Sequence, residues 1–167
     1  AQLSVSSDMI DIPGTILLGK KFLLSTNLQA QNYKVIYNLY YTPAKLYKWG
    51  RRATLKCPRC GQDDADQVHM FATCSFLREY WAKILAFIGQ ISSQVINFSP
   101  QLIMLGLSSE PPLFLAIVVG RIIIASEWIN VAPPAYQHWH TRFLAINYME
   151  LPLYALKEKK ARQRGLR

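Results

Sequence analysis

The stretch Cys57-Pro58-Arg59-Cys60-Gly61, followed by His69-Met70-Phe71-Ala72-Thr73-Cys74, decides how this chain folds. Its spacing is C-x2-C-x8-H-x4-C, and it contains all three cysteines of the sequence. Zinc takes four cysteine or histidine ligands in a tetrahedron, and two cysteines separated by two residues are a usual half of a structural site. Three cysteines cannot all pair in internal disulfides, so a disulfide framework does not explain the cluster. The spacing predicts a structural zinc site with ligands Cys57, Cys60, His69 and Cys74.

The charge of the 167-residue chain is distributed unevenly around this motif. The formal net charge is +9, and no acidic residue lies between Ile12 and Gln62. A second basic stretch covers residues 157–167, and the sequence between the two basic regions is slightly acidic. A polyanion, most simply a nucleic acid, is the partner that this distribution indicates. The alternative is a pair of solvated basic segments that aid solubility.

A run of basic side chains leads directly into the zinc motif. Basic groups neutralise phosphates, and aromatic rings interleaved with them can stack on unpaired bases. Tyr47 and Trp49 lie in this run, but we expect their rings to be core residues that anchor the knuckle. The candidate nucleic-acid ligands are Lys45, Lys48, Arg51, Arg52, Lys56 and Arg59.

The sequence predicts a mainly α fold, a small helical domain organised around the Cys3His zinc knuckle. We expect an irregular segment at 1–24, a zinc-knuckle domain with flanking helices at 25–90, a helical part at 91–156 and a basic tail at 157–167. Pro13-Gly14 interrupts the first segment. A helix capped by Ser25 or Thr26 should run to Tyr41, and Thr42-Pro43 should begin a second one that Gly50 ends.

An amphipathic helix is predicted after Cys74, with Ser75 as its cap and Gly89 as its stop. We expect its apolar face, Phe76 to Ile88, to pack on the face formed by Tyr33, Ile36, Tyr37 and Tyr40. The acidic residues Asp63, Asp64 and Asp66 should form a surface loop between the two ligand pairs.

The C-terminal part is less well defined by its pattern. Residues Leu102–Leu107 are apolar but undecided in type, and Leu113–Ile129 fits a central helix or a pair of strands broken at Gly120. Pro133-Pro134 should begin a further helix, and Pro152 should end it. His138 and His140 face different sides of that helix, so we do not expect a second metal site there.

The quoted residues resemble the reverse-transcriptase zinc-binding domain found in the C-terminal region of LINE-type (non-LTR) retrotransposon polyproteins. The resemblance covers roughly residues 33–85, and the chain departs from the family at Ala72 and at Ser75, where an aromatic residue and a proline are common. It implies zinc ligation by the four residues named above and basic positions at Lys45, Arg51 and Arg59. The residues that carry it are Tyr41-Thr42-Pro43-Ala44-Lys45-Leu46-Tyr47, Gly50-Arg51, Cys57-Pro58-Arg59-Cys60-Gly61, His69-Met70-Phe71, Cys74 and Tyr80-Trp81.

The resemblance further implies a fragment of a longer polyprotein that assists binding of template RNA, with DNA as the alternative, beside the polymerase. The sequence contains no paired aspartates at a strand turn and no phosphate-binding glycine loop, so we expect a non-enzymatic chain with no small-molecule substrate. A structural docking domain, or a host-derived protein in which this module stands alone, remains the alternative. No apolar run approaches the length of a membrane span, and we expect an intracellular protein of the nucleus or cytoplasm.

Overall fold

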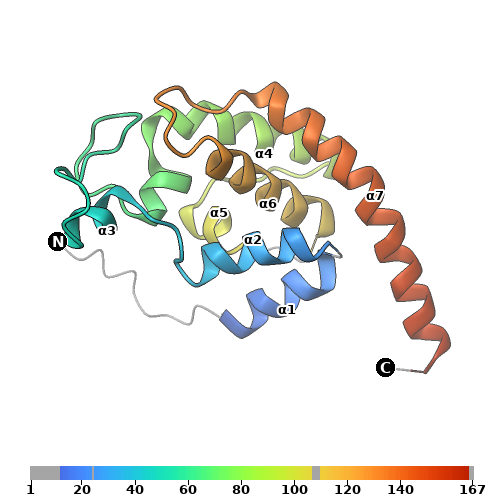
Figure 1. Cartoon of the computed structure of the whole chain (residues 1–167). Helices are drawn as coiled ribbons and strands as arrows, with labels where there is room; N and C mark the ends of the chain where they lie inside the picture. Colours follow the sequence, from blue (N-terminus) through green and yellow to red (C-terminus); the bar gives the residue numbers. More distant parts are fainter. Residues whose placement is uncertain (1–11, 24, 107–109, 166–167) are drawn as a thin grey trace.

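The computed structural model describes residues 12–23, 25–106 and 110–165, and Figure 1 shows how its helices are arranged. In these ranges all regular structure is helical and no strand occurs. The predicted mainly α fold is therefore confirmed. The α-helices are α1 (Ile12–Phe22), α2 (Thr26–Ile36), α3 (Pro43–Lys48), α4 (Arg78–Ser92), α5 (Pro100–Leu105), α6 (Pro111–Ser126) and α7 (Tyr136–Gln163), with a π-helical turn η1 (His69–Thr73) and a 3-10 turn η2 (Ser75–Leu77) before α4.

Helix α6 is the centre of the molecule. Every residue from Leu113 to Arg121 is buried, as expected of a helix that is apolar nearly all round. It packs against α1, α2, α4 and α7, and it lies in the middle of the view in Figure 1. The helical alternative for Leu113–Ile129 is thus correct and the strand pair is excluded, although the helix ends at Ser126.

Arg121 is the one charged residue within this apolar helix, and it is buried. Its Nη1 donates to the carbonyl of Met104 at 2.6 Å, and its Nη2 donates to Oδ1 of Asn32 at 2.6 Å. Burial lowers the pKa of Arg121 to about 10, and nearby Tyr40 offsets part of that effect. The guanidinium therefore joins three helices, α2, α5 and α6, through hydrogen bonds.

A close contact between α4 and α6 requires a glycine. A Cβ added at Gly120 would lie 2.6 Å from the six-membered ring of Trp81, which is closer than real Cβ contacts allow. The hydroxyl of Tyr80 donates to the Gly120 carbonyl at 3.2 Å. The indole Nε1 of Trp81 donates to the carbonyl of Phe71 at 2.7 Å and so connects α4 to η1. Trp81 thus couples the central helix to the segment that carries two of the predicted zinc ligands.

The N-terminal part differs from the prediction in two places. The segment that was expected to be irregular contains helix α1. Pro13 does not prevent this helix, because it stands in the first turn, where a missing backbone N–H costs no hydrogen bond. Residues 1–11 and 24 lie outside the described residues. Helix α2 ends at Ile36 instead of Tyr41, and Asn38 then turns the chain in the left-handed conformation with φ 52°. Helix α3 begins as predicted, with Thr42 Oγ1 accepting from the Lys45 amide at 3.2 Å.

Helix α4 also differs from its prediction. Ser75 begins the short turn η2 and α4 starts at Arg78, so Ser75 is not the cap of the long helix. The helix continues past Gly89 to Ser92 and ends where Ser93 adopts a left-handed conformation. The predicted packing of this helix on the tyrosine face of α2 is wrong, because α6 lies between α4 and α2 and contacts both.

The last two helices extend the fold beyond its predicted limits. Pro100 begins α5, which resolves the undecided segment as helix up to Leu105; Leu107 lies outside the described residues. Helix α7 begins at Tyr136, a little after the predicted Pro133-Pro134 start, and continues through Pro152 into the basic tail as far as Gln163. Its C-terminal half projects past the other helices in Figure 1.

One continuous hydrophobic core includes buried residues from Phe22 to Phe143. Residues 25–90 and 91–156 therefore share a core. Within the described ranges, no helix combines the length and the hydropathy needed to cross a bilayer.

Candidate metal centre

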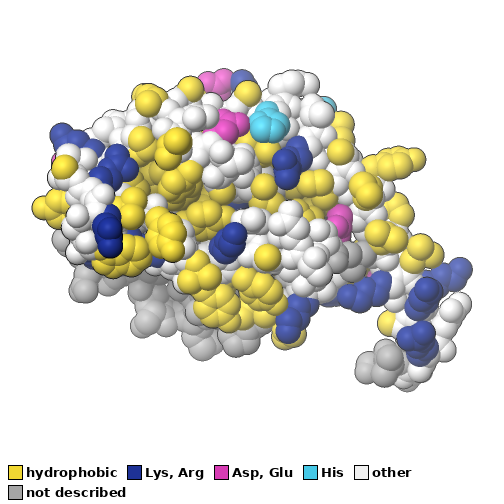
Figure 2. Space-filling model, viewed as in Figure 1, with side chains coloured by type: hydrophobic (Ala, Val, Ile, Leu, Met, Phe, Trp, Pro, Cys, Tyr) yellow, Lys and Arg dark blue, Asp and Glu magenta, His cyan; other side chains and the backbone are white. Residues whose placement is uncertain are grey.

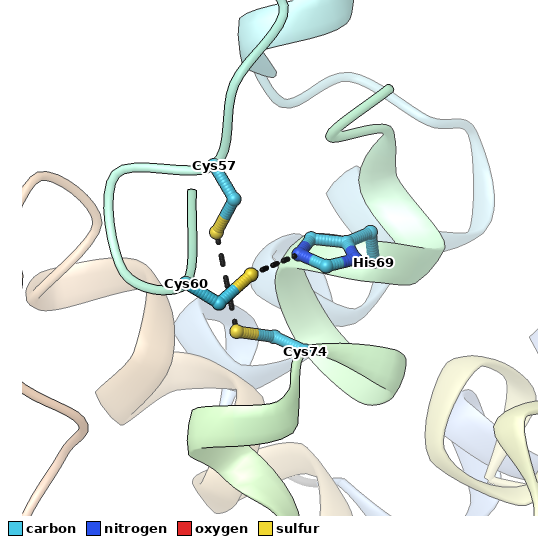
Figure 3. Close-up of side chains that lie close together, drawn as sticks. All are labelled: Cys57, Cys60, His69 and Cys74. Carbon is cyan, nitrogen blue, oxygen red and sulfur yellow. Dashed lines mark hydrogen bonds between the residues drawn. The ribbon is translucent and has the colours of Figure 1, made fainter. Parts of the chain in front are cut away.

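The four predicted zinc ligands come together at one point of the structure. Figure 3 shows the side chains of Cys57, Cys60, His69 and Cys74 pointing toward one another. Their ligand atoms all lie within 4.8 Å of one another. Cys57 Sγ is 3.9 Å from Cys74 Sγ, and Cys60 Sγ is 3.3 Å from Nε2 of His69. The four residues can therefore hold a metal ion, as predicted.

The first two ligands lie on a tight turn between α3 and η1. The amide of Gly61 donates to the Cys57 carbonyl at 3.0 Å, and the amide of Cys57 donates to the Gln62 carbonyl at 2.8 Å. Gly61 has φ 72°, a left-handed conformation that glycine adopts without steric cost. These contacts close the loop and direct both thiols to the same side.

The other two ligands lie at the two ends of the π-helical turn η1: His69 begins it and Cys74 follows its last residue. The amide of Cys74 donates to the carbonyl of His69 at 3.0 Å, which is the i to i+5 bond of a π turn. On an α-helix, residues five apart would point about 140° from each other, since each residue advances by about 100°. The wider π turn brings His69 and Cys74 closer to one side. Asp66 fixes the start of this segment, because its Oδ1 accepts from the His69 amide at 2.7 Å.

The donor set and its dimensions fit zinc. A tetrahedral ion with Zn–S bonds of about 2.3 Å separates its sulfur ligands by roughly 3.8 Å. The distance of 3.9 Å between the sulfurs of Cys57 and Cys74 agrees with that separation. In the part of the chain that the structure describes, this is the only group of three or more histidine, cysteine or acidic side chains close enough to share an ion. His138 instead contacts Glu127, with Nδ1 and Oε1 separated by 3.0 Å.

The protonation of the ligands follows from their burial. Burial lowers the pKa of His69, so its ring is neutral near pH 7 and in the form that binds metals. Burial raises the pKa of Cys74 to about 12, so this thiol carries a proton until an ion displaces it. Burial also raises the pKa of Cys60, but hydrogen bonds with the Gln62 backbone and with the other two thiols lower it by more.

Arg59 was predicted to bind nucleic acid, and the structure corrects that prediction. Its side chain is only 4% exposed, and its Nη1 donates to the carbonyl of Met70 at 3.0 Å. Burial lowers the pKa of Arg59, and attraction to the thiols of Cys57 and Cys74 opposes this. Arg59 therefore connects the cysteine turn to the π turn and places a positive charge beside the thiols.

The other predicted nucleic-acid ligands divide into two groups. Lys45 is half-buried, and its Nζ donates to the backbone carbonyls of Asn38 and Tyr40, so it stabilises the end of α2. Arg52 is also half-buried, with Nη2 3.4 Å from the carbonyl of Lys56. The remaining three side chains are exposed and make no hydrogen bond or ion pair with other described residues; they are Lys48, Arg51 and Lys56.

The prediction that Tyr47 and Trp49 are core residues is wrong. Their exposed fractions are 46% and 57%. Trp49 instead lies against Tyr41, which is 66% exposed, with the two ring centroids 5.9 Å apart in an edge-to-face arrangement. Figure 2 shows basic and hydrophobic side chains interleaved on the side of the molecule where α3 lies. Asp63 and Asp64 are exposed, as expected for a surface loop.

Sequence reasoning missed Tyr41 and Trp128 as neighbours of this surface. The Nε1 of Trp128 donates to the carbonyl of Tyr41 at 3.1 Å, across 87 positions of sequence. No local sequence pattern predicts a contact between residues so far apart in the chain. The only available signal was the presence of a tryptophan next to Ile129, just after an apolar helix.

A comparison of the sequence with protein-family models finds no match, and a comparison with curated proteins finds none either. The resemblance to the reverse-transcriptase zinc-binding domain therefore stays a prediction that rests on the residues quoted for it.

Proposed function

We propose that the chain is a zinc-stapled module that binds RNA and belongs to the C-terminal region of a LINE-type reverse transcriptase, where it assists template binding. The observation that carries this proposal is the position of Lys48, Arg51 and Lys56. These side chains are exposed and unpaired within the described structure, and Lys56 directly precedes the ligand Cys57. Basic side chains that are free of internal partners are available to neutralise phosphates.

Zinc is the ion that this donor set favours. Three thiolates and one imidazole are soft or borderline ligands, and zinc accepts them without a preferred geometry of its own. Four protein ligands leave no coordination position for water, which is the arrangement of structural rather than catalytic sites. We therefore infer a binding role and no enzymatic activity for this chain.

Contacts to the phosphate backbone should dominate the affinity. The exposed basic residues lie on α3, a helix of six residues, and on the loop after it, and among the described residues no long helix presents base-reading side chains beside them. Such binding is weakly sequence-specific and falls steeply with salt, with a slope near −0.7 per phosphate contact on single strands.

The test is the salt dependence of binding to a fluorescently labelled single-stranded RNA. Lys48→Ala combined with Arg51→Ala should flatten the slope by about 1.4, because two phosphate contacts are lost. The matched control is Lys159→Ala with Lys160→Ala, which removes the same charge from the exposed end of α7. If only the control variant shows a flatter slope, the RNA-binding site lies on α7. If the chain does not bind RNA even at low salt, the proposal is excluded.

A docking role on another protein is the second candidate. It is favoured by exposed apolar side chains along α7: Tyr148, Met149, Leu153 and Leu156 are all at least half exposed. Under this reading RNA affinity is absent, and substitutions on α7 weaken attachment to the rest of the polyprotein.

A further inference from the structure

A hollow of about 260 Å³ opens beside the metal centre, between α3 and the chain that connects α6 to α7. Its size lies just below the range of about 300–1,000 Å³ typical of small-molecule pockets, so it suits one planar group and not a large ligand. The lining residues that matter here are Tyr41, Arg52, Pro58, Met70, Trp128 and Ile129.

Two of the lining residues belong to the metal centre itself. Pro58 lies between the ligands Cys57 and Cys60, and Met70 directly follows the ligand His69. Met70 is fully buried, and its carbonyl accepts the hydrogen bond from Arg59. The ion that joins the two ligand pairs would therefore also fix the floor and one wall of the hollow.

The opposite wall is fixed by aromatic packing. The ring of Trp128 lies 5.1 Å from that of Phe71 and 5.3 Å from that of Tyr40. Its hydrogen bond to the Tyr41 carbonyl fixes the backbone from which the exposed Tyr41 ring projects. A wall that is already ordered loses little entropy when a ligand enters.

The rim combines exposed rings with positive charge. Tyr41 and Trp49 form an edge-to-face pair that is more than half exposed, and a pair of this kind presents ring faces to solvent. Arg52 lines the hollow, its neighbour in sequence Arg51 is exposed, and no acidic residue lines the hollow. Aromatic faces flanked by cations are the recognition chemistry of unpaired nucleic-acid bases, because every base has a face that stacks.

We propose that this hollow receives an unpaired base of single-stranded nucleic acid, which stacks on Tyr41 while Arg52 contacts the adjoining phosphate. The inference rests on the proposed function and specifies its substrate as a single strand. Bases within a duplex are already stacked on one another and cannot enter such a site. The positive rim favours this occupant over an apolar peptide, which would gain nothing from the charge.

The experiment compares the zinc-loaded chain on two labelled oligomers of equal length, an oligothymidylate and an abasic strand with the same phosphates. Stacking of a base is worth about tenfold or more in affinity, so the oligothymidylate should bind about tenfold more tightly. Tyr41→Ala should lose at least about half of this preference, expressed as the logarithm of the affinity ratio, and should keep the wild-type affinity for the abasic strand. Tyr41→Phe should retain the preference, because it keeps the ring.

Tyr148→Ala is the matched control, since Tyr148 is 85% exposed on α7 and lies in no part of the hollow. Binding of the oligothymidylate should also quench tryptophan fluorescence in the wild type, because Trp128 lines the hollow. Equal affinity for the two oligomers, with the salt dependence intact, would overturn the base site and leave the proposed function standing. If neither oligomer binds, both the base site and the proposed function are overturned. If a peptide binds saturably at the hollow and no base preference is found, the hollow is a site for a protein partner and the base site is overturned.

Discussion

Arg59 donates a 3.0 Å hydrogen bond to the carbonyl of Met70, and this bond joins the two halves of the metal centre. Arg59 stands between the ligands Cys57 and Cys60, while Met70 follows the ligand His69. The bond is buried, so water does not compete with it. A residue that reads as a phosphate ligand in the sequence therefore acts as a structural connector.

Replacing Arg59 by Ala should destabilise the fold by about 2–4 kcal/mol, because it leaves a buried carbonyl without a partner and opens a cavity. Thermal unfolding of the zinc-loaded chain measures this effect. The salt dependence of RNA binding by the folded variant should match the wild type. A slope flatter by about 0.7 with unchanged zinc content would show instead that Arg59 contacts a phosphate.

Zinc should bind with one ion per chain, and its removal should loosen the segment between α3 and α4. The free energy of metal binding at a structural site contributes largely to folding, and it is on the order of 10 kcal/mol in small zinc peptides. Here the core around α6 contains many residues outside the site, so helix should persist after chelation. Hydrogen exchange of the metal-free chain should show protection lost over residues 50–77 and retained in α6. Cys74→Ala should behave like chelation, and equal thermal stability with and without zinc would contradict the structural role.

Gly120→Ala should destabilise the protein even though alanine is the better helix former. The gain in helix propensity is about 1 kcal/mol, whereas overpacking in a core costs typically 1–3 kcal/mol. The added Cβ would lie 2.6 Å from the Trp81 ring, so the steric cost should exceed the gain in propensity. The test is a double-mutant cycle with Trp81→Phe, which removes the clashing atoms. Additive losses in free energy of unfolding would show that the two residues do not interact in this way.

Metal binding should release protons and strengthen as pH rises. The raised pKa of Cys74, about 12, means that its thiol is protonated at pH 7 and loses the proton to bind an ion. The lowered pKa of His69 means that this ring competes for protons only below the ordinary histidine range. Calorimetry in buffers of different ionisation enthalpy should therefore detect at least one proton released per zinc at pH 7. A heat of binding that is independent of the buffer would contradict this assignment.

The ligand set and several helices were predictable because their signals are local. Cys57 and Cys60 are two residues apart, and Thr42-Pro43 caps and starts α3 through contacts within its own first turn. The apolar content of α6 left a helix and a pair of strands as alternatives, and only the structure decided between them. Ligand spacing and helix caps depend on residues that are neighbours in the chain, so a sequence pattern can predict them.

The failures came from contacts between distant residues. Helix α7 continues through Pro152 because tertiary contacts fix the residues on both sides of it. Glu150 Oε1 accepts a hydrogen bond from the Ser25 amide at 3.1 Å, and the Tyr154 ring packs edge-on against Phe22. The exposure of Trp49 depends on where α3 lies relative to Tyr41. The π turn at His69 is a single turn of five residues, which is too short for a helical periodicity to reveal it.

We expect the metal centre to order the surface formed by Lys48, Arg51 and Lys56, so that the affinity for RNA depends on zinc. The measurement is the affinity for single-stranded RNA of the zinc-loaded chain, the zinc-free chain and Cys74→Ala, at one low salt concentration. The loaded chain should bind at least about tenfold more tightly than the other two. Adding zinc back should restore the affinity of the wild-type chain but not that of Cys74→Ala. Equal affinity of all three proteins would contradict it.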